Sequence, residues 1–232
     1  MKILPIIPSL DPDNKLIILV DNLIKSGYNK ILIVDDGSKD KTIFNKLKEY
    51  KECIILTHEI NKGKGEALKT AFKYYKDNLM DKNKGVICLD SDGQHLVEDI
   101  INISNKLVET DNFILGTRLF NTKETPFKNK FGNRTTSFLF KLLYKVYLKD
   151  TQTGLRAIPN RLIDMHLSTE GSRFEYEINT LIELVLNKEK IEEVDIKTVY
   201  LKDSNKHSHF NPIIDSYRVY KALLGRKIKL TN

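Results

Sequence analysis

The sequence predicts an α/β fold in which helices flank a mostly parallel β-sheet. Short apolar runs alternate with stretches of about 10–15 residues that suit helices, which is the pattern of a parallel sheet. The first five apolar runs each lead into a polar motif, and ligands of such sheets bind beyond the carboxyl ends of the strands. The 232 residues suit one large domain without a linker or repeat, so we expect a single domain over residues 1–232.

The expected elements follow one another regularly through the first half of the chain. Residues 3–7 are the first expected strand, and apolar side chains between residues 16 and 24 then recur at helical spacing until Gly27. Further strands are expected at residues 30–34, 53–57, 85–89 and 112–116. In the less regular second half we expect a basic helix at 133–148, an amphipathic helix at 175–187, a strand at 192–201 and a basic amphipathic end.

The composition is that of a folded globular chain. Hydrophobic residues make up 41% and charged residues 30%. No apolar run reaches the roughly 20 residues of a membrane-spanning helix, and the first residues do not resemble a signal peptide, so we expect a cytoplasmic protein. Cys53 and Cys88 lie in apolar runs, and we expect reduced thiols rather than a disulfide or a zinc site.

The net charge of +7 is concentrated in two segments. Residues 119–149 contain seven Lys/Arg and one acid, and residues 204–232 contain six Lys/Arg and one acid. The remainder of the chain is close to neutral or acidic. This distribution indicates a polyanionic partner, which could be nucleic acid, an anionic membrane or a phosphorylated substrate.

Three oxygen-bearing side chains follow the expected strand at 85–89. Asp90, Asp92 and Gln94 stand at alternating positions, and such ligands suit a hard divalent cation, Mg²⁺ or Mn²⁺. A calcium-binding EF-hand loop starting at Asp90 would need glycine and glutamate where the chain has His95 and Ile101. A simple turn is the remaining alternative, but the neighbouring polar loops favour the metal site.

Two further loops have more than one interpretation. "NKGKGEALK" lacks the spacing of a nucleotide-binding phosphate loop, and its glycines either let the backbone approach a ligand or begin a helix. "VDDGSKDKT" offers two acids that could accept hydrogen bonds from a base or from ribose hydroxyls, although Asp-Gly-Ser also forms ordinary turns.

Taken in order, these segments resemble the family 2 glycosyltransferases, especially the dolichyl- and undecaprenyl-phosphate sugar transferases. "VDDGSKDKT", "NKGKGEAL", "LDSDGQH", "GTR" and "DTQTGLRA" match motifs of that family, and "KHSHFNPIIDSYRVY" is similar to the segment that follows the core in bacterial members. "IPSLDPDNKL" departs from the family pattern I-P-x-Y-N-E, because Leu10 and Asp11 replace tyrosine and asparagine. The resemblance covers nearly the whole chain and implies the GT-A fold, a Rossmann-like, mostly parallel sheet flanked by helices.

The resemblance implies a role for each matched position. Nucleotide-sugar binding is implied for Pro8, Ser9, Leu10, Asp35, Asp36, Gly37, Lys62, Gly63, Asp90, Ser91, Lys206 and His209. The metal ligands would be Asp90, Asp92 and Gln94, and an acceptor phosphate would contact Arg118, Arg134 and Ser137. The catalytic residues would be Asp92, Arg118, Arg134 and Asp150. For Ser137, Lys206 and His209, a capping serine and two surface cations remain alternatives.

The expected function is that of a metal-dependent, inverting glycosyltransferase. It would move a sugar from a UDP- or GDP-sugar to a polyprenyl phosphate at the cytoplasmic face of the membrane. A bound cation would neutralise the nucleoside diphosphate as it leaves. A phosphate acceptor is already anionic, so arginines that position it would suffice without a general base.

The chain end, residues 212–232, is expected to be a basic amphipathic helix that contacts an anionic membrane. Its apolar face would comprise Ile213, Ile214, Tyr217, Tyr220, Leu223 and Leu224, flanked by Arg218, Lys221, Arg226 and Lys227. The protein would then be peripheral at the inner face of the membrane, alone or beside a small integral-membrane partner. Packing of this helix onto the domain is the alternative.

Three other functions compete with this hypothesis. A soluble family 2 enzyme acting on a hydroxyl of a glycan, teichoic acid or protein would need a carboxylate base, such as Asp150 or Glu175. A nucleic-acid-binding module would not need the metal motif, so we expect no nucleic-acid partner. A nucleotide-sugar-binding protein without activity is the third alternative. No feature of the sequence indicates an oligomeric state.

Overall fold

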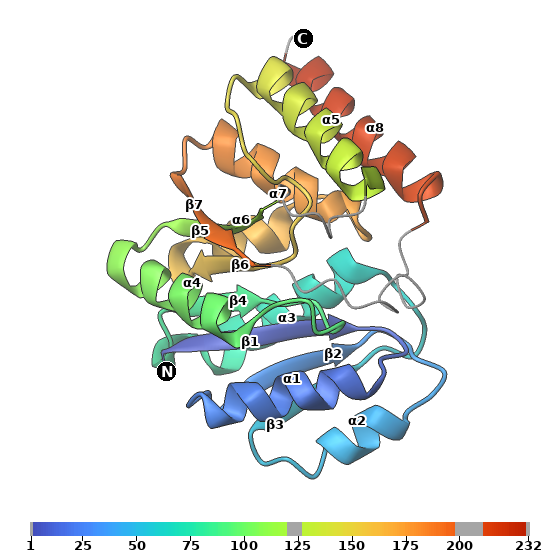
Figure 1. The fold of residues 1–232 in the computed structure, drawn as a ribbon, viewed down its shortest axis with the longest axis vertical. Coiled ribbons are helices and arrows are strands. Elements are labelled where there is room, and N and C mark those ends of the chain that lie inside the picture. The colour runs from blue at the N-terminus through green and yellow to red at the C-terminus, as the bar shows by residue number, and fades with distance from the viewer. Residues whose placement is uncertain (1, 120–126, 198–210, 231–232) are drawn as a thin grey trace.

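The computed structural model describes residues 2–119, 127–197 and 211–230, and these form one sheet with helices on both faces (Figure 1). The strands are β1 (Ile3–Ser9), β2 (Ile31–Asp35), β3 (Cys53–Thr57), β4 (Gly85–Cys88), β5 (Phe113–Arg118), β6 (Arg156–Pro159) and β7 (Ile191–Ile196). The sheet order is β3-β2-β1-β4-β6-β5-β7. Only β6 runs antiparallel to its neighbours β4 and β5 among the described strand pairs. The predicted mostly parallel α/β sheet is confirmed.

The helices divide between the two faces of the sheet. They are α1 (Asn14–Lys25), α2 (Thr42–Leu47), α3 (Lys64–Asn78), α4 (Val97–Thr110), α5 (Phe127–Tyr144), α6 (Ile163–Ser168), α7 (Glu175–Leu186) and α8 (Ile214–Leu230), with short 3₁₀ turns at Met80–Lys82 and Asn160–Leu162. One apolar core joins the sheet to α1, α2 and α4, and a second joins it to α3, α6 and α7. Successive residues of β2 enter opposite cores: Leu32 and Val34 one, Ile31 and Ile33 the other. A strand covered on both faces needs apolar residues at every position, which explains the continuous apolar runs.

Helices α5 and α8 lie side by side beyond the sheet (Figure 1). The Tyr144 hydroxyl near the end of α5 donates a hydrogen bond to the carbonyl oxygen of Leu223 at 2.8 Å. The Leu223 side chain is fully buried, and Tyr220 is only half-buried. The prediction that Leu223 belongs to an exposed apolar face is therefore wrong, because this position packs α8 onto the domain.

The basic helix and one strand differ most from what the sequence predicts. The helix expected at 133–148 begins six residues earlier and ends at Tyr144, where Lys145 has a φ of 61° and so breaks the helical conformation. Strand β6 was not expected. It is four residues long and begins with Arg156, whose guanidinium is buried and donates to the carbonyl oxygens of Thr153 and Glu177.

Because β1, β2, β4 and β5 are parallel to one another, their carboxyl ends lie at one edge of the sheet. The polar motifs predicted to converge follow these strand ends. The carboxyl edge of the sheet is therefore the place to examine for function.

Candidate active site

The loops after β1 and β2 are tied together by their own polar groups. The amide of Asp11 donates to Ser38 Oγ at 2.8 Å, and the carboxylate of Asp11 accepts from the Lys39 amide at 2.7 Å. Ser9 is buried, and its hydroxyl has no hydrogen-bond partner within the described residues. The segment that departs from the family motif thus still packs against the "DDGS" loop, with Pro8 and Ser9 in β1 and Leu10 directly after it.

Asp35 and Asp36 are both buried, and their carboxylates organise this edge. Asp35 accepts from the Ser38 amide at 2.8 Å and from the Lys41 ammonium. Asp36 accepts from the amides of Lys62 and Gly63 at 2.9 and 2.8 Å, and it also contacts His58. These bonds join the loop after β2 to "NKGKG", as the sequence predicts for neighbouring strand ends. A contact of either carboxylate with a nucleotide stays a prediction.

The glycines of "NKGKG" allow a close approach of protein backbone. Gly63 has a φ of 101°, and a Cβ there would lie 2.5 Å from the carbonyl oxygen of Ser172. A Cβ at Gly65 would lie 2.7 Å from Cβ of Tyr176. The sequence suggested that these glycines either let the backbone approach a ligand or begin a helix. The structure adds a third reason for them, because the segment before α7 packs directly against this loop. Gly37 has a similar constraint, because its Cβ would lie 2.3 Å from the carbonyl carbon of Ile60.

Lys64 lies between two acids at the base of the site. Its ammonium is 2.7 Å from Asp90 Oδ1 and 2.9 Å from Glu177 Oε1. Burial opposes the charged form of Lys64, but Asp90 and Glu177 outweigh it and raise the lysine pKa. Burial likewise opposes the charged form of Asp90, yet Lys64 and His95 outweigh it and lower the aspartate pKa. Sequence analysis missed Lys64 and Glu177; the second lysine of "NKGKG" was the available signal.

Asp92 has the opposite electrostatic environment. Burial and the charge of Asp90 both raise the pKa of Asp92. One of its oxygens accepts from the Gln94 amide at 3.0 Å, which closes the turn after β4. Ser91 and Gln94 are half-buried beside it. The turn and the metal-site interpretations of this motif are thus compatible, because the turn places two carboxylates near one another.

The residues present suit a hard cation that shares its coordination with a ligand. In the part of the chain that the structure describes, no three His, Cys, Asp or Glu side chains gather as a complete metal cage. Asp90, Asp92 and Gln94 supply carboxylate and amide oxygens, and Mg²⁺ is commonly held by one or two carboxylates together with substrate phosphates. A cation there would also relieve the repulsion that raises the pKa of Asp92.

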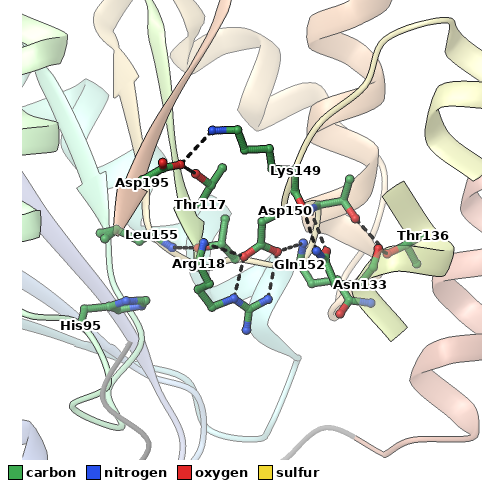
Figure 2. Close-up of polar contacts among 12 residues, drawn as sticks. His95, Thr117, Arg118, Asn133, Thr136, Lys149, Asp150, Gln152, Leu155 and Asp195 are labelled. Carbon is green, nitrogen blue, oxygen red and sulfur yellow. Dashed lines mark hydrogen bonds and ion pairs between the residues drawn. The ribbon is translucent and has the colours of Figure 1, made fainter. Parts of the chain in front are cut away.

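Arg118 and Asp150 form the second charged centre (Figure 2). Arg118 donates from Nε to Asp150 Oδ2 at 2.6 Å and from Nη2 to Oδ1 at 2.9 Å. The amides of Arg118 and Gln152 also donate to this carboxylate, at 3.2 and 3.0 Å. Asp150 is fully buried, so its charge depends on these four donors. The pair joins "GTR" to "DTQTG" and fixes the direction of the guanidinium.

The remaining predicted site residues are placed differently. Arg134 is exposed on α5, and Ser137 is buried on the same helix with a hydroxyl that has no partner within the described residues. Neither makes a hydrogen bond with the Arg118–Asp150 pair within the described ranges. Lys206 and His209 lie outside the residues that the structure describes.

Comparison with known proteins gives consistent relationships. The family described as "Glycosyl transferase family 2" matches residues 6–167. A UDP-N-acetylglucosamine–dolichyl-phosphate N-acetylglucosaminyltransferase of Methanococcus voltae is 34% identical over 245 residues, which cover 96% of this chain and 95% of that protein. A dolichyl-phosphate β-glucosyltransferase of Saccharomyces cerevisiae is 29% identical over 82% of this chain and 65% of its own length.

Solved structures are similar in fold at low sequence identity. Glucosyl-3-phosphoglycerate synthase of Mycobacterium tuberculosis, in complex with Mn²⁺, UDP and glucosyl-3-phosphoglycerate, has a TM-score of 0.70 at 15% identity, covering 97% of this chain and 79% of that one. Mannosyl-3-phosphoglycerate synthase of Rubrobacter xylanophilus has a TM-score of 0.71 at 14% identity, covering 100% and 75%. These similarities support the fold alone.

Gly154 leaves the space that Asp90 occupies, so its replacement should impair ligand binding without unfolding the chain. A Cβ at residue 154 would lie 2.3 Å from Asp90 Oδ2, so the end of the Asp90 side chain would have to shift. We expect Gly154→Ala to weaken binding of a uridine or guanosine diphosphate with Mn²⁺ about tenfold or more, as measured by calorimetry. Gly225→Ala, at an open helical position, is the control. Unchanged affinity in Gly154→Ala would contradict this account of Asp90.

Lys64 should contribute stability that depends on pH. Lys64→Met leaves Asp90 and Glu177 without their shared cation, and we expect a loss of about 2–3 kcal/mol at pH 7, moderated because Asp90 is 32% exposed. The Asp90 pKa is lowered in the folded wild type, so the stabilisation exists above its unfolded pKa and is lost as pH falls through the folded value. The difference between wild type and variant should therefore shrink below about pH 4.

Denaturant titrations at several pH values measure this difference. Lys62→Met is the matched control, because Lys62 is an exposed lysine two positions away. A loss that stays constant with pH would show that the lysine contributes by packing and not through its charge.

Proposed function

Because the chain belongs to glycosyl transferase family 2, we propose that it transfers a sugar from a nucleotide-diphosphosugar to a polyprenyl phosphate. The relative from Methanococcus voltae is named for a dolichyl-phosphate acceptor, and it aligns over nearly the whole of both chains. That name also makes a UDP-sugar the first donor to test.

The state of Asp150 is the observation that carries the choice of acceptor. A hydroxyl acceptor needs a base, but both oxygens of Asp150 already accept hydrogen bonds from Arg118 and from the Gln152 amide. Glu175, the other candidate base, accepts from the amides of Ser172 and Arg173 through one oxygen. Its second oxygen has no hydrogen-bond partner within the described residues but is buried, and so is shielded from an acceptor. A phosphate acceptor needs no base, and Asp150 would orient Arg118 toward it.

The roles follow from these positions. Asp90, Asp92 and Gln94 would hold Mg²⁺ or Mn²⁺, which supplies charge neutralisation of the departing diphosphate. The loops with Pro8, Ser9, Asp35 and Asp36 would bind the nucleoside. Arg118 would position the acceptor phosphate for direct displacement, which inverts the anomeric centre.

We also infer that α5 and α8 together contact the membrane that holds the acceptor. In the described ranges, no helix combines the length and apolarity needed to cross a bilayer. Apolar side chains are nevertheless exposed on both helices: Phe131, Phe138 and Leu142 on α5, and Ile213, Ile214, Tyr217 and Leu224 at and along α8. Exposed Arg134 and Lys141 flank the first group, and exposed Lys221 accompanies the second. Basic helices with exposed aromatic residues suit the interface of an anionic bilayer.

Asp92→Asn tests the proposed reaction. We expect transfer from a UDP-sugar to undecaprenyl phosphate to fall at least about 100-fold, because the second carboxylate of the cation site is lost, while circular dichroism stays unchanged. Asp77→Asn, at an exposed aspartate paired with Lys73, is the control. Full activity of Asp92→Asn in the presence of EDTA would exclude the metal-dependent mechanism.

The acceptor is tested in the same assay by substituting an oligosaccharide for the lipid phosphate. The soluble, hydroxyl-directed alternative predicts transfer to the oligosaccharide and loss of that activity in Glu175→Gln. Our proposal predicts transfer only to the lipid phosphate.

Substitutions on α5 and α8 test the membrane surface. We expect Phe138→Ser and Tyr217→Ser each to reduce co-sedimentation with vesicles containing anionic lipid several-fold, because each removes exposed apolar area. Ile18→Ser, at a similarly exposed apolar position of α1, is the matched control. Point substitutions are preferable to deletion of α8, since deletion would uncover the core around Leu223. Equal losses in all three variants would contradict a surface on α5 and α8.

A further inference from the structure

The first half of helix α5 carries buried polar side chains that the proposed function does not use. Asn133 and Thr136 are each 1% exposed, whereas Phe131 and Phe138 on the outer side are each 63% exposed. Buried polar side chains are costly unless their hydrogen bonds are made, so their partners indicate what they hold.

Asn133 bonds the main chain on both sides of Asp150. Its Nδ2 donates to the carbonyl oxygen of Lys149 at 2.8 Å, and its Oδ1 accepts from the Thr151 amide at 3.1 Å (Figure 2). One side chain thus satisfies the donor and the acceptor that flank the buried carboxylate.

Thr136 supplies a second link from the next turn of the helix. The Thr151 hydroxyl donates to Thr136 Oγ1 at 2.9 Å, and the Thr136 hydroxyl is within bonding distance of the carbonyl oxygens of Gly132 and Asn133 at 3.1 and 3.0 Å. Both threonines are buried. The segment 149–151 is therefore fixed to α5 at three points.

The same segment determines where Asp150 meets Arg118. A two-point contact between a carboxylate and a guanidinium requires both groups in one plane, so a small shift of the Asp150 backbone would turn the guanidinium. Asp195 holds the neighbouring residues from the other side, because it accepts from Thr117 Oγ1 and from the Lys149 ammonium, each at 2.9 Å. The bonds from Asp195 come from β7, whereas those from Asn133 and Thr136 come from α5, which we propose to contact the membrane.

We propose that Asn133 and Thr136 are positioning residues for the transfer reaction. They hold Asp150 so that the Arg118 guanidinium keeps a fixed direction toward the acceptor phosphate. Because both residues are on α5, the direction of the guanidinium also depends on the position of this helix. This inference rests on the proposed function for the identity of the acceptor, but the contacts themselves do not depend on it.

Steady-state kinetics of Asn133→Ala and Thr136→Val test the inference. We expect kcat/KM for the acceptor to fall about tenfold, while the affinity for UDP with Mn²⁺ stays within about twofold, because the nucleotide loops are held by other residues. Thr135→Val is the matched control: this neighbouring hydroxyl bonds only the Phe131 carbonyl oxygen of its own helix among the contacts described. Thr136→Ser keeps the hydroxyl and should retain most of the activity.

A double-mutant cycle separates positioning from general stabilisation. If Asn133 acts through Asp150, Asn133→Ala should cause little further loss in an Asp150→Asn background. Additive losses, a parallel fall in nucleotide affinity, or an equal effect of Thr135→Val would each overturn the inference. Thr136→Val keeps the test available if Asn133→Ala fails to fold.

The proposed function and this inference fail in distinguishable ways. A wild-type chain that transfers sugar to a hydroxyl acceptor, or only to water, contradicts the proposed function. The same variants are then compared on that reaction, and the cycle with Asp150→Asn still decides whether Asn133 and Thr136 act through Asp150.

Discussion

The ion pairs of Lys64 with Asp90 and Glu177 are the interaction on which the site depends. A parallel sheet places the ends of several strands together, and here those ends carry acids that would repel one another in a half-buried setting. Lys64 compensates Asp90, which follows β4, and Glu177 in α7. Its position at the start of α3 follows from the close contact between the "NKGKG" loop and the segment before α7. The close packing at Gly63 and Gly65, the position of Lys64 and the charge compensation of Asp90 therefore depend on one another.

The other acids of the edge are compensated by different means. Asp36 depends on backbone amides, Asp35 on an amide and a lysine, and Asp150 on an arginine. Asp92 differs, because burial and the charge of Asp90 both raise its pKa. Of these acids, Asp92 would therefore be stabilised most by a bound cation. Arg118 is a cation whose guanidinium direction is fixed by Asp150. In the proposed reaction, the first centre would serve the donor diphosphate and the second the acceptor phosphate.

Much of the fold was predictable from the sequence, because burial on both faces leaves a clear apolar run such as residues 31–34. Strand β6 was not, since its first residue is a buried arginine and its length is four residues. The end of α5 was missed because Lys145, and not a glycine, adopts the left-handed conformation.

The candidate site was likewise predictable only in part. Local motifs indicated Asp90, Asp92, Arg118 and Asp150, and the structure brings Arg118 and Asp150 together. Lys64 could not be recognised from the sequence, because its second partner, Glu177, is 113 positions away and a lysine in a loop ordinarily faces solvent. Asn133 was hidden for the same reason: its role depends on a loop that follows the helix.

The direction of β1 has a practical consequence for attaching the protein to a sensor or a label. The strand enters the sheet from the edge opposite the acids, so the amino terminus and the carboxyl edge lie apart, whereas the carboxyl terminus follows α8 (Figure 1). Immobilisation through an amino-terminal tag would leave both the polar loops at the carboxyl edge and the outer surface of the paired helices open to solution. A fusion at the other terminus would place a bulky neighbour next to the helix whose proposed lipid contacts are to be measured.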